Sequence, residues 1–349
     1  MKLFSCQICG QTLYFENGSC LSCGHTVGFL PVEGRMVAVD PSGGGWTVAG
    51  TPTEDNAAPQ QYKFCKNWEL SACNWLVEDK GDGGEYCHAC RHNHIVPDLS
   101  KKENVKRWQA IERAKRRLIY TLMELDLPVP ISGDLPLVFD FLADAPSGKQ
   151  AMTGHAKGLI TIALTEADDA QREERRQRMG EAYRTLLGHF RHEVGHYYWD
   201  FLLADGPMLE RYRTLFGDER VDYGDALERH YKNGAPENWA ASFVSAYATM
   251  HPWEDWAETW AHYLHMIDSL ETALGHGVPL AAPIFVGPLT QTPAENLFAA
   301  WIPLTVTLNA MSRSMGESDL YPFVLTAPVQ EKLAFVHEVV STQGRGFAA

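Results

Sequence analysis

The sequence predicts an α+β protein in two parts, a small cysteine-rich module followed by a mainly helical domain with a small β-sheet. All eight cysteines lie within the first ninety residues of the 349-residue chain. Beyond residue 100, apolar residues recur at helical spacing in several long segments. Only two stretches there, 135–141 and 158–164, have the composition of β-strands. We therefore expect a module over 1–98 and a domain over 99–349.

The overall composition is that of a globular protein, with 45% apolar and 21% charged residues. The formal net charge of −14 argues against a nucleic-acid partner, because phosphate binding needs clustered positive charge. No apolar run is long enough to span a membrane, and the first residues lack the apolar segment of a signal peptide. We expect a cytoplasmic protein without a membrane partner, whose reduced cysteines hold metal rather than form disulfides.

The first four cysteines form two Cys-x2-Cys pairs: Cys6 with Cys9, and Cys20 with Cys23. Each pair turns tightly enough for both sulfurs to reach one ion, and two pairs complete a tetrahedron. Short apolar stretches between the pairs suit a small ribbon of strands. The spacing predicts a structural zinc site, because redox-active pairs would need a flanking βαβ pattern.

A second set of cysteines follows residues 31–62, which are rich in proline, glycine and small polar residues and suggest a linker or a loose hairpin. The simplest grouping is a second structural zinc site made by Cys65, Cys73, Cys87 and Cys90. Its first spacing is irregular, so three histidines stay open as alternative ligands: His88, His92 and His94. A cross-braced arrangement, in which each ion takes pairs from both sets, is also open.

Residues 101–125 predict a helix with apolar residues on one face. Eight lysines and arginines lie between Lys101 and Arg117. We interpret them as a solvated basic face; a docking patch for an acidic partner is the alternative.

The motif His192-Glu193-x-x-His196 is the signature of zinc peptidases. The segment 175–203 contains no proline and has helical periodicity, so both histidines lie on one helical face and can bind one ion. Glu193 is then placed to take a proton from an attacking water. The alternative is an amphipathic helix with ordinary histidines. The strand at 158–164 precedes this helix; it is either an edge strand that pairs with extended substrate or a core strand.

A zinc hydrolase also needs a third protein ligand and an open fourth position. Glu254 and Glu258 lie on one face of a helix that begins at Pro252. One carboxylate can complete the zinc site, and the other can accept the free N–H of a ligand histidine. Two solvated glutamates are the alternative, but the histidine motif and the aromatic residues around them favour the metal site.

These two motifs together resemble the gluzincins, zinc peptidases whose third ligand is a glutamate on a later helix. The resemblance implies that Glu254 is the ligand, that Glu258 lies in the outer shell, and that Tyr247 stabilises the oxyanion. Because Glu258 stands where many gluzincins have aspartate, the choice between the two glutamates stays open.

Nearly the whole chain resembles the bacterial zinc-binding metallopeptidases that carry an N-terminal zinc-ribbon domain. The residues that carry this resemblance are the first four cysteines, 87–91, 95–99, the histidine motif, 251–263 and 319–325.

The resemblance implies one catalytic and two structural zinc ions and a peptide or protein substrate. A different hypothesis is an inactive peptidase-like scaffold that recruits a protein partner through its ribbon; retention of the expected catalytic residues argues against it.

Overall fold

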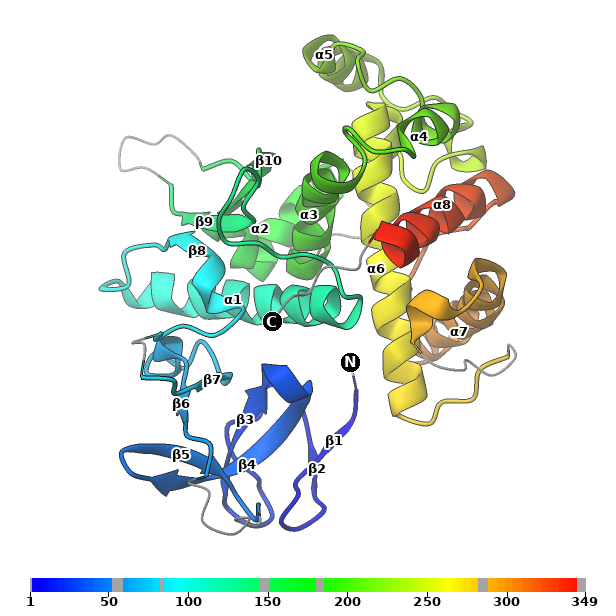
Figure 1. The fold of residues 1–349 in the computed structure, drawn as a ribbon. Helices are drawn as coiled ribbons and strands as arrows, with labels where there is room; N and C mark the ends of the chain where they lie inside the picture. The colour runs from blue at the N-terminus through cyan, green and yellow to red at the C-terminus, as the bar shows by residue number, and fades with distance from the viewer. Residues whose placement is uncertain are drawn as a thin grey trace.

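The computed structural model describes residues 2–51, 59–81, 84–144, 151–179, 185–281 and 288–343. Figure 1 shows a strand-rich N-terminal part, a long helix α1 next to it, and a helical part beyond. The predicted α+β class is confirmed. No helix among the described residues has both the length and the apolar character needed to cross a membrane.

Two antiparallel sheets make up the N-terminal part. A two-stranded sheet pairs β1 (Phe4–Ser5) with β2 (Thr12–Leu13). A five-stranded sheet follows in chain order: β3 (Thr26–Leu30), β4 (Arg35–Ser42), β5 (Gly45–Val48), β6 (Tyr62–Phe64) and β7 (Leu76–Glu78).

The predicted loose hairpin is therefore a regular one, and the linker interpretation is wrong for residues 35–48. Its turn is formed by Gly43 and Gly44, which both have positive φ, 59° and 87°, as a tight two-residue hairpin turn requires. The rest of the predicted linker includes residues 52–58, which lie outside the described residues.

A third sheet belongs to the helical part and has the strand order β10-β11-β9-β8. The strands β8, β9 and β11 are parallel, whereas β10 is antiparallel to β11. Their bounds are β8 (Asn93–Ile95), β9 (Val138–Leu142), β10 (Gly154–Ala156) and β11 (Leu159–Ala163).

Both predicted strands are present, but the strand at 158–164 is not the edge. Lys157 and Gly158 have positive φ, 48° and 82°, and reverse the chain so that β10 covers the outer side of β11. A Cβ on Gly158 would lie 2.1 Å from the carbonyl oxygen of Pro136, so this turn requires glycine.

Eight α-helices and several short 3-10 helices complete the described fold. The predicted helix over 175–203 is observed as two segments, and residues 180–184 between them lie outside the described residues. The α-helices are α1 (Lys102–Glu124), α2 (Asp169–Met179), α3 (Leu186–Leu202), α4 (Leu209–Phe216), α5 (Tyr223–Asn233), α6 (Pro252–Gly275), α7 (Ala294–Ser314) and α8 (Ala327–Gln343).

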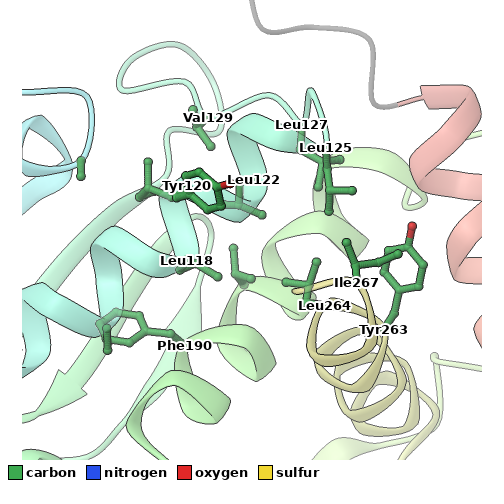
Figure 2. Packing of buried hydrophobic residues seen from close by; sticks show 14 of the residues in the cluster. Leu118, Tyr120, Leu122, Leu125, Leu127, Val129, Phe190, Tyr263, Leu264 and Ile267 are labelled. Atoms are coloured by element: carbon green, nitrogen blue, oxygen red, sulfur yellow. The ribbon is translucent and has the colours of Figure 1, made fainter. Parts of the chain in front are cut away.

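Helix α1 connects the N-terminal part to the helical part through one continuous core. Figure 2 shows Leu118 and Leu122 of α1 beside Phe190 of α3 and Leu264 of α6. Tyr120 packs against an aromatic group from the ribbon that includes Phe15, at a ring distance of 5.3 Å. The ribbon is thus part of the same buried cluster as the helices.

The basic residues of α1 are only partly a solvated face. Lys115 and Arg116 are buried. Arg107 pairs with Asp168 of the following segment, and Arg117 pairs with Glu16 of the ribbon. The solvated-face interpretation is wrong for the buried Lys115 and Arg116. It holds for Arg107 and Arg117, whose side chains stay 32% and 42% exposed, and for the exposed remainder: Lys101, Lys102, Lys106 and Arg113.

Candidate metal centre

The candidate site forms where α3 and α6 pack against each other. Helix α3 begins after Thr185, whose hydroxyl accepts a hydrogen bond from the backbone N–H of Gly188. Gly195 on α3 allows a close approach, because a Cβ there would lie 3.0 Å from Cα of Ala257 on α6. The indole N–H of Trp256 then donates to the carbonyl of Gly195 at 2.8 Å. This packing brings the histidine motif against the first turn of α6.

Three metal-ligating atoms converge at this contact. The Nε2 atoms of His192 and His196 lie 3.2 Å apart. Oε2 of Glu254 lies 3.0 Å from Nε2 of His192 and 3.5 Å from Nε2 of His196. The arrangement has two imidazoles and one carboxylate, as in a catalytic zinc site with an open position.

Glu258 lies behind His192 rather than with the converging atoms. Nδ1 of His192 donates to Oε1 of Glu258 at 2.7 Å, and the hydroxyl of Ser245 donates to Oε2 of the same carboxylate at 2.7 Å. A proton held on Nδ1 leaves the lone pair of Nε2 directed at Glu254. The geometry therefore places Glu254 among the ligand atoms and Glu258 as the partner that orients an imidazole.

A divalent cation fits this donor set. Oε2 of Glu254 is buried and has no hydrogen-bond donor, although it faces two imidazole nitrogens. Burial disfavours charge at His192, but the neighbouring carboxylates of Glu254 and Glu258 raise its pKa well above the ordinary value. Burial likewise opposes ionisation of Glu254, yet the neighbouring imidazoles of His196 and His192 hold its pKa well below normal. The site favours a positive charge among these atoms, which a zinc ion would supply.

Glu193 and Tyr247 both lie close to His192. Glu193 follows it directly on α3 and is only 8% exposed. Tyr247 lies on a 3-10 turn (Tyr247–Thr249) just before α6, with its ring 6.1 Å from that of His192. Burial and the negative charge of Glu254 raise the pKa of Tyr247, so its hydroxyl stays protonated and can donate.

Sequence reasoning missed Tyr223, the first residue of α5. Its hydroxyl donates to Oε1 of Glu254 at 2.7 Å, on the oxygen that does not face the histidines. Burial raises the pKa of Tyr223, so this donor also stays protonated. A single tyrosine far from both motifs carries no spacing signal that could have found it. Ser245 was missed for the same reason.

The other side of His196 is covered by aromatic rings. Trp253 lies 4.1 Å from the imidazole of His196, and His155 of β10 lies parallel to it at 6.1 Å. Burial lowers the pKa of His155 to about 3, so this ring is neutral. The edge strand β10 therefore packs against the site through His155.

The eight cysteines form two separate groups. Within each group the sulfurs all lie within 4.8 Å of one another: Cys6, Cys9, Cys20 and Cys23 in the first, and Cys65, Cys73, Cys87 and Cys90 in the second. Each group has the four convergent sulfurs of a closed tetrahedral zinc site. The second group is buried throughout, whereas Cys9 of the first is exposed.

Among the described residues, neither a cross-braced group nor a histidine-containing cysteine group is found. His92 instead hydrogen-bonds to the carbonyl of Leu137, and His94 pairs with Asp140.

Comparison with known proteins agrees with this geometry. Residues 104–339 match the family described as "Putative zinc-binding metallo-peptidase". The chain belongs to this family. Residues 3–101 match a zinc-ribbon domain, so the resemblance expected from the sequence is confirmed.

Uncharacterised proteins of Mycobacterium bovis and of two strains of Mycobacterium tuberculosis are each 46% identical over 345 residues, which cover 97% of this chain and 95% of the relative. No solved structure matches the chain significantly.

Proposed function

We propose that the protein is a zinc-dependent peptidase that cleaves peptide bonds with an activated water. The observation that supports this proposal most is the convergence of His192, His196 and Glu254, with Glu193 on the same helix as the histidines. Among the described residues only three protein atoms converge here, which supports a hydrolytic rather than a structural zinc site.

A zinc ion at this position would supply Lewis-acid activation of water and of the scissile carbonyl. Glu193 would take the proton of the attacking water and pass it to the leaving amine. Tyr247 would donate its hydroxyl to the developing oxyanion, and losing one such donor typically costs about 10²–10³ in rate. Tyr223 holds the outer oxygen of Glu254 and thereby fixes the orientation of this carboxylate.

In this proposal each chain binds three zinc ions, one catalytic and two structural. The two cysteine groups have no open position and take no part in the chemistry. The proposed location is the cytoplasm, where thiols stay reduced and can hold metal.

The test combines a metal count with a digest of a peptide library. Purified protein should contain three zinc ions per chain and cleave peptides in a zinc-dependent way. Glu193→Gln should keep all three ions and lose hydrolysis, whereas His192→Ala should keep only the two cysteine-bound ions. Cleavage that persists in Glu193→Gln would refute the role given to Glu193. A zinc count of two with no cleavage would favour the inactive scaffold instead.

A further inference from the structure

Helix α5 has an apolar face that the rest of the described protein covers poorly. Tyr223, Ala226, Leu227, His230 and Tyr231 follow one another at the spacing of a single helical face. Of the whole helix only Ala226 is buried. Tyr223 is 38% exposed and Tyr231 is 69% exposed. Ala226, His230 and Tyr223 of this face contact the rest of the protein, whereas most of Tyr231 and part of Leu227 stay accessible to another group.

This face is directed at the candidate metal centre. At the start of α5, Tyr223 donates to Glu254 at 2.7 Å. Two turns later, the ring of His230 lies 5.8 Å from that of Tyr247, edge to face. Figure 1 shows α5 standing beyond the N-terminal end of α6, apart from the packed helices.

The position of the apolar face of α5 indicates that a peptide substrate would bind to it. Through Tyr223 and His230 it adjoins Glu254 and Tyr247, so a peptide bound for cleavage there would pass along it. Apart from His230, its members are aliphatic and aromatic, whereas the charged residues of α5 lie on the opposite, exposed side: Asp225, Glu228, Arg229 and Lys232. An apolar wall without a fixed charge favours apolar side chains, because a charged one would lose hydration without gaining a partner.

We propose that α5 forms the wall of a substrate subsite in which Leu227 and Tyr231 select peptides with a large aliphatic or aromatic side chain next to the scissile bond. This inference rests on the proposed peptidase function and names its substrate class. Removing a large apolar contact of this kind costs about 10- to 100-fold in selectivity between an apolar and a polar side chain.

The experiment compares matched peptides that differ at one position beside the cleavage site, phenylalanine or leucine against aspartate or lysine. The ratio of kcat/KM is measured for wild type, Leu227→Ala and Tyr231→Ala. Tyr231→Phe keeps the ring, and Glu228→Ala changes the opposite face of the same helix. A second readout is the Kd of the same fluorescent peptides for the Glu193→Gln protein, with and without the Leu227→Ala change.

The inference requires that wild type prefers the apolar peptide, that Leu227→Ala and Tyr231→Ala lose the preference about tenfold or more, and that Tyr231→Phe and Glu228→Ala keep it. Equal cleavage of all four peptides, or a preference that survives both alanine changes, overturns it while leaving the peptidase proposal intact. If no peptide is cleaved but apolar peptides bind in a Leu227-dependent way, the peptidase proposal fails and the subsite stands. If the peptides are neither cleaved nor bound, both proposals are overturned.

Discussion

Zinc affinity at the candidate centre should depend on Glu258, although this residue is not among the converging atoms. Glu258 accepts a hydrogen bond from Nδ1 of His192 and another from Ser245, each at 2.7 Å. A hydrogen bond to a charged group contributes about 1.5–3 kcal/mol, which is roughly 10- to 150-fold in an equilibrium constant. Loss of an outer partner of a ligand histidine typically lowers metal affinity about 10- to 100-fold.

Two variants separate the contribution of the Glu258 charge from that of its hydrogen bond with His192. In Glu258→Gln the amide oxygen can still accept from His192, but the bond loses its charge and about half its strength. We expect about a tenfold loss of zinc affinity for Glu258→Gln and about a hundredfold loss for Glu258→Ala. The affinity is measured by competition with a fluorescent zinc chelator, and total zinc is counted in the same samples.

The cysteine sites provide an internal control, because both variants should keep two tightly bound ions. Glu237→Gln, at an exposed position, should behave as wild type. The reasoning fails if Glu258→Ala binds the third ion within about twofold of wild type, which is below the smallest effect expected of an outer partner. It also fails if the variant releases all three ions together, since that pattern indicates general unfolding.

Three further predictions concern packing, pH and metal release. Gly195→Ala should cost about 1–3 kcal/mol of unfolding free energy and weaken zinc binding, because the new Cβ would meet Cα of Ala257 at 3.0 Å and push α3 away from α6. Urea unfolding and zinc competition measure the two effects, and unchanged values for both would contradict the prediction. Burial lowers the pKa of His262 to about 4, below its value of about 6.5 in an unfolded chain. Its contribution to stability is therefore complete above pH ~6.5 and is lost as pH falls toward 4. The unfolding free energy measured from pH 7 to 4 should fall less steeply in His262→Asn than in wild type, and equal slopes would rule this out. A chelator should remove zinc from the cysteine group that contains the exposed Cys9 before it removes zinc from the group that contains the buried Cys73. The rate of zinc release is compared in Cys9→Ser and Cys73→Ser proteins, each of which lacks one of the two sites. The reverse order would show that burial does not protect the second ion.

The sequence was sufficient for features set by local spacing. The cysteine pairs, the histidine motif and the helix that begins at Pro252 each have a short-range pattern, and the structure brings each predicted group together. The choice between Glu254 and Glu258 could not be made from spacing, because both lie on the same helical face. It depends on the packing angle of α3 against α6, which only the folded chain defines.

Other features depended on contacts between distant segments. Nothing near Tyr223 indicates that it reaches Glu254, because α5 is placed by the fold and not by its own composition. Lys115 read as part of a solvated basic face, but it is buried next to Glu112, with which it forms an ion pair. The edge position of β10 depends on the turn at Gly158, whose role is visible only in its contact with Pro136.

The division of the metal centre between α3 and α6 has a consequence for biosynthesis. Each cysteine group is drawn from a short run of chain near the N-terminus and can load while the rest is still being translated. The histidines at 192 and 196 can bind an ion only weakly until Glu254 has been synthesised and the two helices have packed together. Under the proposed function, maturation would therefore have an order, with the cysteine-bound ions first and the ion between α3 and α6 last, so that a half-made chain would lack hydrolytic activity.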